Sequence, residues 1–505
     1  MAKKQLAINM TANFVAFLVQ FGINFFFTPY LIRTVGKEAY SFFPLASSFI
    51  GYAGIITVAL NSMASRFITI RIQQNDTEGA NIYMNSVLYG NTIMAVALTI
   101  PSVFILLFLN NILNIPAAIF DDIQWLFGLV MLSMILNIQL SVFGVATYAT
   151  NRLDLSSLRN AESNILRVIL LVLMFYFFRP SVVYIGIANL VVAAFILMTN
   201  VYYTKKLLPQ ITFDRKFFRL GAIKELLGAG VWNSINQLSI VLMSNLDLLI
   251  ANIYLGASIT GELAIVKTVP IFINTIIITL VSVFAPEFTI LYAKNKTEEL
   301  IQSIKTSLKF MSSLMTLPIG FLLIMGSDFF TLWVPGQDSS MLFILSNLTL
   351  VPMIISTSIE TLFHVFSVTN KLKTPSIVFV LSGVVNVLLI IGLLKYTNIG
   401  VYAIPIVGMV SAVLQHSVFT PIYAAKSLKV NPFTFHFAIV RGLLNCGIMM
   451  LVTYLLSKVI FQHDWKSFVF LAFVSSVITL IINMLIFFSR EEKITFAKKL
   501  KLIKK

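Results

Sequence analysis

The sequence is poor in charge. Of its 505 residues only 11% are Asp, Glu, Lys or Arg, whereas 58% are hydrophobic, and the mean hydropathy is +0.91. A soluble domain carries about 25% charged residues, so this chain cannot cover a water-facing surface. The composition excludes a soluble globular protein and predicts an all-α, polytopic membrane protein, because helices satisfy their own backbone hydrogen bonds in lipid.

The sequence also lacks the usual marks of an enzyme. Its single cysteine, Cys446, lies in an apolar run, so there is no disulfide framework. It has no P-loop, no H-E-x-x-H, C-x-x-C or G-x-S-x-G motif, and no long loop with the paired acids that a membrane glycosyltransferase needs. We therefore predict no catalytic residue, no ATPase activity and no cofactor. The net charge of +16 is assigned to membrane topology and not to nucleic-acid binding.

A window of about 20 apolar residues predicts about 14 transmembrane helices. Basic residues concentrate in alternate loops, which predicts a multi-pass protein of the bacterial cell membrane with both termini in the cytoplasm. The first apolar run is too long for a cleaved signal sequence and is expected to be an uncleaved span. The predicted parts are an N-terminal lobe of six spans at 1–203, a basic linker at 204–223, a second six-span lobe at 224–430, two C-terminal spans at 431–489 and a basic tail at 490–505.

The two predicted lobes look like copies of one unit. Shifting the chain by 220 residues places Gly36 on Gly256 and the Asn-x-Thr-Glu run at Asn75 on that at Asn295. Shifting it by 219 residues places Thr150-Asn-Arg-Leu on Thr369-Asn-Lys-Leu. Both lobes have six spans and hence one orientation, so they should be related by an axis along the membrane normal, with a binding site between them.

Two spans carry a stripe of polar residues on one helix face. The stripe in the first span is Asn9, Asn13, Gln20 and Asn24. The stripe in the seventh is Asn233, Asn236, Gln237, Ser244 and Asp247. We interpret them as walls of one hydrated substrate cavity; the alternative is that the amides hydrogen-bond neighbouring helices and serve only packing.

Lys267 is the most informative cation, because ionisable residues within a span are functional candidates. Asn274 lies two turns further along the same face. Lys267 either faces the cavity or extends to the membrane interface. Arg33 and Arg66 lie at the ends of the first two spans, where each is a candidate cavity residue or an interfacial anchor.

Ion coupling has two candidate sites. Ser356, Glu360 and His364 are spaced four residues apart, so a carboxylate and an imidazole could share a proton; a neutral packing pair is the alternative. A sodium site of oxygen ligands is the second possibility. Its candidate residues are Asp247, Ser382, Asn386 and Ser411.

The run TPYLIRTVGKEAYSFFPLASSFIGYAGIITVALNSMASRFIT at 28–69 resembles the start of the bacterial flippases of O-antigen and capsule repeat units. These belong to the multidrug/oligosaccharidyl-lipid/polysaccharide exporter superfamily. The elements of the resemblance are P-Y-L-I-R-x-V-G, Tyr40-Ser41 where the family more often has Tyr-Gly, Asn61-Ser62 and Arg66-Phe67. The second-half segment from Leu255 through Lys267 to Pro286-Glu287 is similar as well.

The resemblance implies a fold of two six-helix lobes plus two further helices. It implies movement of an undecaprenyl-pyrophosphate-linked oligosaccharide from the inner to the outer leaflet by alternating access, coupled to Na⁺ or H⁺. Amides suit sugar hydroxyls and cations suit a pyrophosphate, and the lipid tail would stay in the bilayer beside the last two helices. The implied surroundings are membrane lipids and the polymerase and glycosyltransferases of polysaccharide assembly, with the protein as a monomer.

Three alternatives remain open from the sequence. A multidrug exporter of the same superfamily is favoured by Asp247 and Glu360, and opposed by Lys267. A lipid II-type flippase would use the same mechanism on another head group. A membrane-embedded polymerase or glycosyltransferase is opposed by the internal duplication and by the missing catalytic loop.

Overall fold

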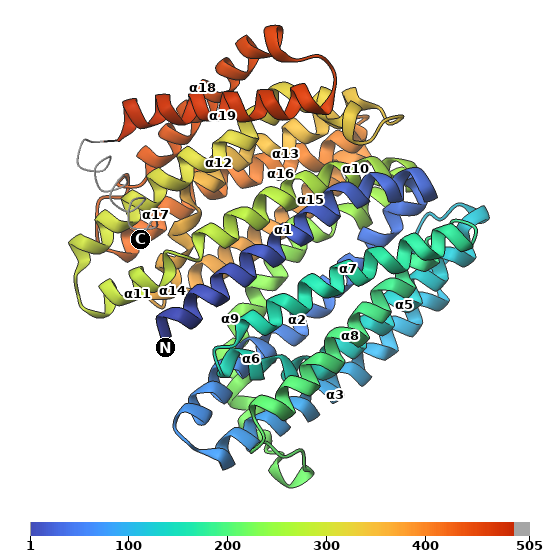
Figure 1. The fold of residues 1–505 in the computed structure, drawn as a ribbon, viewed down its shortest axis with the longest axis vertical. Helices are drawn as coiled ribbons and strands as arrows, with labels where there is room; N and C mark the ends of the chain where they lie inside the picture. The colour runs from blue at the N-terminus through green and yellow to red at the C-terminus, as the bar shows by residue number, and fades with distance from the viewer. Residues whose placement is uncertain (1, 489–505) are drawn as a thin grey trace. The chain divides into compact units, whose positions relative to one another are not determined.

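The computed structural model describes residues 2–488, and all regular structure in that range is helical (Figure 1). Thirteen helical stretches of the described chain are long and apolar enough to cross a membrane. One of them, Leu220–Ala293, has 74 residues and is interrupted at Gly256. At 1.5 Å per residue it is ~110 Å long, enough to cross a ~30 Å hydrocarbon core twice. The predicted all-α polytopic fold is therefore confirmed, while the predicted tail at 490–505 lies outside the described residues.

The chain forms two compact units. Unit 1 comprises Met1–Ala264 and Ser376–Val401, and unit 2 comprises Ile265–Pro375 and Tyr402–Lys505. Their bounds differ from those of the predicted lobes, which follow the sequence repeat. The lobes at 1–203 and 224–430 stay a prediction.

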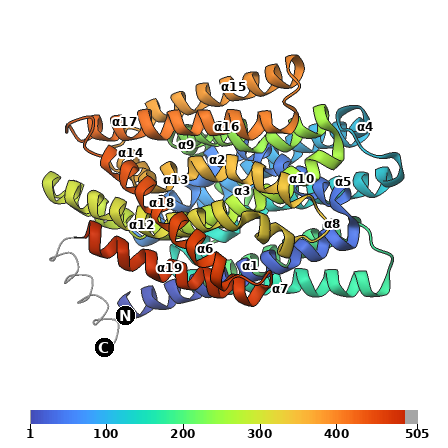
Figure 2. The same cartoon turned by 90° about the horizontal axis from the view of Figure 1, so that it is seen from above.

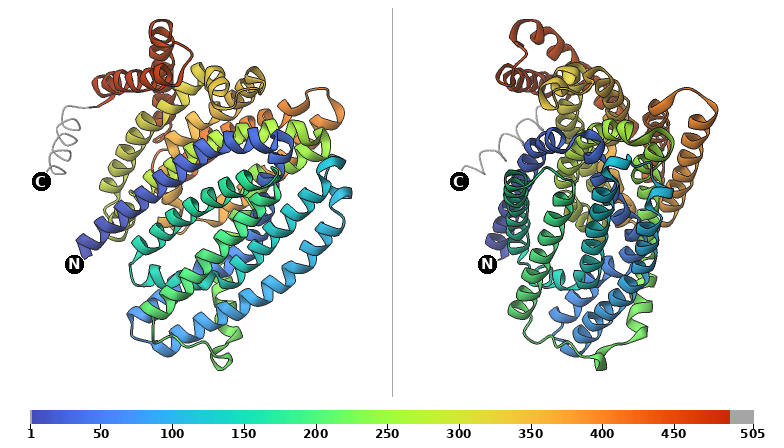
Figure 3. Two further views of the ribbon diagram at one scale, coloured as in Figure 1. Left: turned by 45° about the vertical axis from the view of Figure 1, so that its right-hand side comes forward. Right: turned by 90° about the vertical axis from the view of Figure 1, so that its right-hand side faces the viewer.

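Unit 1 contains most of the helices of the first half of the chain, and α1 lies along α7 (Figure 3). Its long helices are α1 (Ala2–Val35), α2 (Lys37–Gln73), α3 (Thr77–Leu107), α5 (Phe120–Leu140), α7 (Leu153–Phe177), α8 (Val183–Leu207), α9 (Leu220–Ile240), the first part of α10 (Asp247–Val281) and most of α15 (Lys373–Tyr396). The shorter ones are α4 (Leu109–Ile112) and α6 (Val145–Ala149). A π-helical turn, Val241–Asn245, joins α9 to α10.

Unit 2 contains the remainder of α10 and the helices of the second half, among which α18 and α19 pack against α12 (Figure 2). These helices are α11 (Ala285–Ala293), α12 (Thr297–Trp333), α13 (Ser339–Ile359), α14 (Phe363–Val368), α16 (Ala403–Leu414), α17 (Thr420–Ser427), α18 (His436–Ile460) and α19 (Trp465–Phe487). A 3₁₀ turn, Glu360–Leu362, separates α13 from α14.

The backbone repeats where the sequence repeats. Gly36 and its counterpart Gly256 both have a positive φ, 86° and 84°, which glycine adopts without steric cost. Asn75 and Asn295 have φ of 58° and 55°, and each is followed by the same helix-ending bond from residue i+5 to residue i. The donors are the N–H groups of Asp76 and Lys296, at 2.9 and 3.0 Å. These are the bonds of a Schellman motif, so the two copies share the same helix ends.

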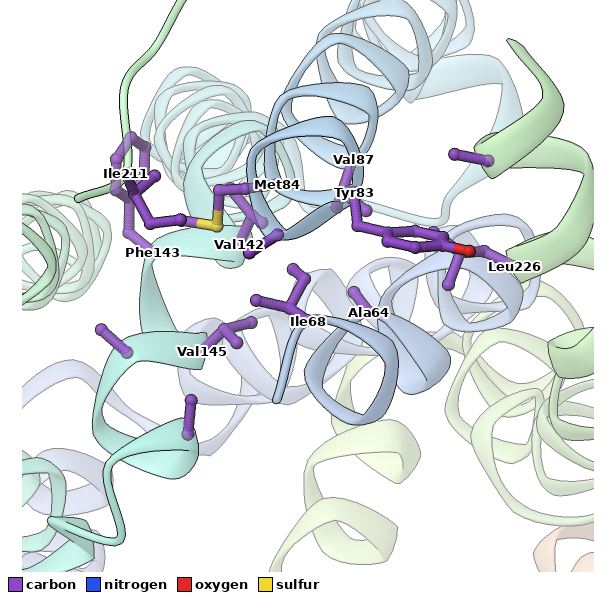
Figure 4. Close-up of a cluster of buried hydrophobic side chains, with 14 of the residues drawn as sticks. Ala64, Ile68, Tyr83, Met84, Val87, Val142, Phe143, Val145, Ile211 and Leu226 are labelled. Atoms are coloured by element: carbon purple, nitrogen blue, oxygen red, sulfur yellow. The ribbon is translucent and has the colours of Figure 1, made fainter. Parts of the chain in front are cut away.

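The buried cores repeat as well. Figure 4 shows the first core in unit 1, where Ile68 and Met84 pack with Phe143. The second core, in unit 2, contains residues at the corresponding positions, including Phe288 and Ile304. The 220-residue offset therefore relates core positions and not only turns, which is what a duplicated helix unit requires.

The basic linker is held in place by α3. Its non-helical part runs from 208 to 219, broken by a short 3₁₀ turn at Arg215–Phe217. The N–H of Thr212 donates to Asn81 Oδ1 (2.7 Å), and the N–H of Asp214 donates to Asn85 Oδ1 (3.0 Å). Asn85 Nδ2 donates to the carbonyl of Thr212 at 2.8 Å. Both asparagines are buried. Their side-chain amides therefore take the place of water as hydrogen-bond partners of the linker backbone.

Asp214 in this linker has a pKa below its usual value. The main cause is the hydrogen bond that the N–H of Lys216 donates to its carboxylate at 3.0 Å, and the Lys216 ammonium adds to it. The carboxylate stabilises the turn that leads into α9.

Replacing Asn81 and Asn85 together by alanine should release the linker. Each lost hydrogen bond contributes about 1 kcal/mol, so amide hydrogen exchange at Thr212 and Asp214 should accelerate by about tenfold or more. The measurement is hydrogen–deuterium exchange by mass spectrometry on the purified protein. Asn164→Ala is the matched control, because the one hydrogen bond of its Nδ2 to the described residues is to Asn160 in its own helix. Unchanged exchange in the double variant would show that the amides do not hold the linker.

Candidate functional site

The polar stripe of α1 is divided between packing and exposed positions. Asn9 is buried, and its Nδ2 donates to the carbonyl and to the side-chain oxygen of Asn151, at 3.1 and 3.0 Å. Its Oδ1 accepts from the N–H of Asp154 at 3.1 Å. Asn13 accepts a short hydrogen bond from Ser157 of α7. These two residues attach α1 to α7, as the packing interpretation expects.

The stripe residues after Asn9 are all less buried than Asn9, and Asn13 is exposed. Gln20 is exposed and Asn24 is half-buried. The first half of the stripe thus serves contacts between helices, while substrate binding by Asn13, Gln20 and Asn24 stays a prediction.

The polar stripe of α9 faces α2. Asn233 Nδ2 donates to Ser62 Oγ at 2.9 Å, and Gln237 Nε2 donates to the carbonyl of Gly51 at 3.3 Å. Close approach of the two helices depends on Gly230, where an added Cβ would lie 1.9 Å from the carbonyl oxygen of Ala59. The structure therefore brings the second stripe onto a tight helix–helix contact, and the role of Asn233 and Gln237 in a substrate cavity stays a prediction.

The sequence does not single out a polar cluster in unit 1 that consists of the buried Asn91, the half-buried Asn61 and the exposed Ser141. Asn91 is fully buried, and its Nδ2 donates to Asn61 Oδ1 (2.9 Å) and to Ser141 Oγ (3.0 Å). Asn61 Nδ2 donates in return to Asn91 Oδ1 at 3.1 Å. Ser141 begins a 3₁₀ turn whose counterpart in the second copy begins at Glu360. Because Ser141 and Glu360 are related by the 219-residue offset, comparing the two copies in the sequence could have indicated that position 141 is a candidate polar site.

A charged pocket of about 360 Å³ was also missed. It lies where α2 ends and α3 and α9 begin. Tyr83 Oη donates to Glu225 Oε2 at 2.5 Å, and the guanidinium of Arg71 lies 5.6 Å from the Tyr83 ring centroid. Arg71 also donates to Asp76 at 3.1 Å. The pocket contains both signs of charge, so it does not by itself favour an anionic or a cationic ligand.

The predicted cations lie in different surroundings. Arg33 and Arg66 are exposed, as interfacial anchors would be. Lys267 is half-buried in the unit 2 part of α10, and Asn274 on the same helix is exposed. Contact of any of these residues with a substrate stays a prediction.

Glu360 and His364 are separated by a change of helix type. The predicted stripe requires a continuous α-helix, but Glu360–Leu362 forms a 3₁₀ turn. A 3₁₀ helix has 3.0 residues per turn, so residues four apart no longer lie on one helix face. His364 Nε2 lies 3.2 Å from the carbonyl oxygen of Val281. No hydrogen bond joins Glu360 to His364 among the described residues, so proton sharing between them stays a prediction.

Asp247 and Asn386 both belong to unit 1. Asp247 begins α10 directly after the π-helical turn, and α15 packs on that turn at Gly383, where an added Cβ would lie 2.6 Å from Leu242 Cβ. Asn386 is buried one turn along α15, and its Oδ1 has no hydrogen-bond partner in the described part of the chain. Across residues 2–488, no group of three or more His, Cys, Asp or Glu could hold a metal ion. A sodium site near Asp247 stays a prediction.

A buried ion pair joins the start of α2 to α10. Lys37 Nζ lies 2.7 Å from Glu262 Oε1, with the side chain of Lys37 27% exposed and that of Glu262 8% exposed. The neighbouring Gly261 allows the contact, because an added Cβ would lie 2.8 Å from the carbonyl oxygen of Lys37. Neither Lys37 nor Glu262 was among the site residues predicted from the sequence. An acid in the apolar run LGASITGELAIV was the available signal.

Known proteins share both sequence and fold with this chain. No family model matches the sequence. The membrane protein EpsK of Bacillus subtilis (strain 168), described as uncharacterized, is 31% identical over 425 residues, which is 84% of this chain and 83% of EpsK.

Two solved structures show the same fold at low sequence identity. The lipid II flippase MurJ in an inward closed conformation has a TM-score of 0.69 and 16% identity, and the match covers 95% of this chain and 98% of MurJ. An inward-facing multidrug resistance transporter of the MATE family, in the MOP superfamily, has a TM-score of 0.67 and 15% identity. That match covers 84% of this chain and 99% of the transporter.

Lys37→Met should destabilise the protein, because it leaves the carboxylate of Glu262 buried without its cation. Loss of one partner of a buried pair costs about 3 kcal/mol, and somewhat less here because Lys37 is partly exposed. The thermal midpoint of the detergent-purified protein, followed by tryptophan fluorescence, should fall.

The reversed pair Lys37→Glu with Glu262→Lys should recover most of the lost stability. Lys395→Met, which removes an exposed lysine of the same unit, serves as the control and should leave the midpoint unchanged. A Lys37→Met protein as stable as the unaltered one would show that the pair contributes nothing.

Proposed function

We propose, from the premise that this chain belongs to the family of Bacillus subtilis EpsK within the multidrug/oligosaccharidyl-lipid/polysaccharide exporter superfamily, that it is a lipid flippase. Its substrate is an oligosaccharide repeat unit linked to undecaprenyl pyrophosphate. The protein moves this substrate from the cytoplasmic to the outer leaflet of a bacterial cell membrane for surface-polysaccharide assembly.

The observation that carries the proposal is the extent of the two structural matches. Nearly the whole multidrug transporter, 99% of its length, aligns with this chain but covers only 84% of it. The lipid II flippase covers 95% of this chain. The longer match supports a lipid flippase over a drug exporter. The described helices α18 and α19 have the length of two further spans, and they would offer a lipid tail an apolar surface.

Polar side chains of the right kind for a glycan and a pyrophosphate occur in the spans. Amides occur along α1 and α9, and sugar hydroxyls both donate to and accept from amides. Lys267 supplies a cation for a phosphate. The enzymes that make and consume the substrate, a glycosyltransferase set and a polymerase, would be the partners of this step.

The test is reconstitution of the purified full chain into sealed proteoliposomes. Lipid-linked oligosaccharide placed in one leaflet should become accessible to a glycosidase that cannot cross the membrane. Lipid II and a fluorescent organic cation, tested in parallel, decide between this substrate and the two alternatives. Transport of the organic cation without movement of the lipid-linked oligosaccharide would refute the proposal and favour a drug exporter.

Lys267→Gln should lower the rate of oligosaccharide translocation by about tenfold or more, since a hydrogen bond to a charged group contributes roughly 1.5–3 kcal/mol. Lys294→Gln, which removes an exposed lysine of unit 2, is the control with the same loss of charge. A full rate in the Lys267 variant, with normal amounts of folded protein, would remove this residue from the mechanism.

Glu360→Gln should change how the translocation rate depends on pH or on sodium, because it removes an ionisable group from the second copy. The measurement is the initial rate in proteoliposomes across a pH series, with and without a sodium gradient. If both dependences match those of the unaltered protein, Glu360 serves packing only.

A further inference from the structure

An arginine lies in the middle of the membrane-spanning helix α7. Arg167 is 14 residues beyond the start of this helix at Leu153 and ten residues before its end at Phe177. At 1.5 Å per residue these separations are ~21 and ~15 Å, so Arg167 lies near the centre of a hydrocarbon core of ~30 Å. Both ends of the span are further away than its side chain extends. An ionisable residue at this depth is a functional candidate.

Arg167 lies on the side of α7 that faces the protein. Ser163 and Leu171, four residues before and after it and hence on the same helix face, are buried. The apolar residues Ile165 and Ile169 are exposed. They are two residues away from Arg167, which is ~200° around the helix. The lipid-facing side of α7 is therefore opposite Arg167, which faces the interior of unit 1.

The guanidinium of Arg167 has no partner among the described residues. Its Nε is buried without a hydrogen bond, and no carboxylate forms an ion pair with it. The helices α1, α6 and α8 pack against α7, and they contain no Asp or Glu. On α7 itself, Asp154 is paired with Arg152, and Glu162 is paired with Arg159. A cation inside the membrane needs a counter-charge, and the described chain does not provide one here.

The register of α1 against α7 shows what lies beside the middle of α7. Near the start of both helices, Asn13 accepts a hydrogen bond from Ser157. Near their ends, the ring centroids of Tyr30 and Phe175 lie 6.0 Å apart. The two helices therefore run parallel and side by side (Figure 3). Residues at the same depth differ in number by 144 or 145.

The amides of α1 closest in depth to Arg167 belong to Gln20 and Asn24. With this offset, Arg167 is level with a point on α1 between them. They lie two and three helical turns beyond Asn13, and so on the face of α1 that contacts α7. Neither side chain hydrogen-bonds a described residue, in contrast to Asn9 and Asn13. Arg167, Gln20 and Asn24 thus lie at one depth, each without a partner in the described part of the chain.

A ligand that fits this level has an anionic oxygen group next to hydroxyl groups. A guanidinium presents its N–H donors as a planar fork that matches the oxygens of a carboxylate or a phosphate. Amides donate to and accept from hydroxyls. A lipid-linked oligosaccharide offers both kinds of group. Its anionic oxygens belong to the pyrophosphate and, in an acidic glycan, also to a uronate.

We propose that Arg167 binds an anionic oxygen group of the lipid-linked oligosaccharide midway through the membrane, while Gln20 and Asn24 bind adjacent sugar hydroxyls. This assignment rests on the proposed function and adds to it a residue of unit 1 that recognises the charge of the substrate. An organic cation would be repelled from the same position.

The test measures binding and translocation separately. The probes are two oligosaccharides on undecaprenyl pyrophosphate that differ in a single sugar, which is a hexose in one and the corresponding uronic acid in the other. Binding to the detergent-purified full chain is followed by native mass spectrometry, and translocation by glycosidase access in proteoliposomes. Binding without translocation would refute the flippase function and leave the site in place. Translocation that does not depend on Arg167 would refute the site alone, and binding of neither lipid would refute both.

Arg167→Gln should weaken binding and slow translocation by about tenfold or more, the usual contribution of a hydrogen bond to a charged group. A loss with both lipids assigns Arg167 to the pyrophosphate. A loss with the uronate lipid alone assigns it to the glycan, and either result supports the site. Arg167→Lys keeps the charge without the planar fork and should retain part of the binding. Arg179→Gln is the matched control, because it removes an exposed arginine two residues beyond the end of α7.

The thermal midpoint of the ligand-free protein separates binding from a structural role. Because Arg167 has no partner among the described residues, Arg167→Gln should leave the midpoint unchanged or raise it. The proposal would be overturned if Arg167→Gln bound both lipids as the unaltered chain does, or if its loss of binding came with a lower midpoint. An equal loss of binding in Arg179→Gln would overturn it as well.

Discussion

Polar groups inside an apolar helix bundle must find their partners within the protein, and the structure depends on this constraint. Asn9 binds Asn151 in the turn before α7 and the N–H of Asp154 in α7, and Asn85 fixes the linker backbone to α3. Lys37 and Glu262 place a complete ion pair between α2 and α10. Each polar side chain would be costly alone in lipid, so each selects a particular neighbour. Hydrophobic burial cannot supply this selectivity where the surroundings are equally apolar.

The internal duplication reproduces the scaffold but not its polar chemistry. Helix ends at Asn75 and Asn295 and the kinks at Gly36 and Gly256 are the same in both copies. The 3₁₀ turns at Ser141 and Glu360 correspond as well. In the first copy Ser141 completes a hydrogen-bonded cluster with Asn61 and Asn91, whereas the second copy places a carboxylate there. The duplication therefore conserves the turn while changing the polar side chain that begins it.

The sequence predicted what depends on composition and periodicity, namely the helical membrane fold, the span count and the repeat. It also predicted the superfamily, through the segment around Gly36. It did not predict contacts between helices, because a stripe shows which face is polar and not which helix it meets. The partners Lys37 and Glu262 are 225 residues apart and not related by the repeat. The prediction that Glu360 and His364 share a helix face required a regular α-helix. No residue in that segment indicates the 3₁₀ turn that interrupts the helix.

The central claim is that the protein carries a lipid-linked saccharide across the membrane, and its most direct test is the leaflet in which that lipid resides. In cells depleted of the protein but still making the saccharide, right-side-out membrane vesicles would be treated with a glycosidase that cannot enter them. The account predicts that the lipid-linked saccharide accumulates and resists the glycosidase until the vesicles are permeabilised, and that re-expression restores its accessibility. A saccharide fully accessible from outside in the depleted cells would contradict the account.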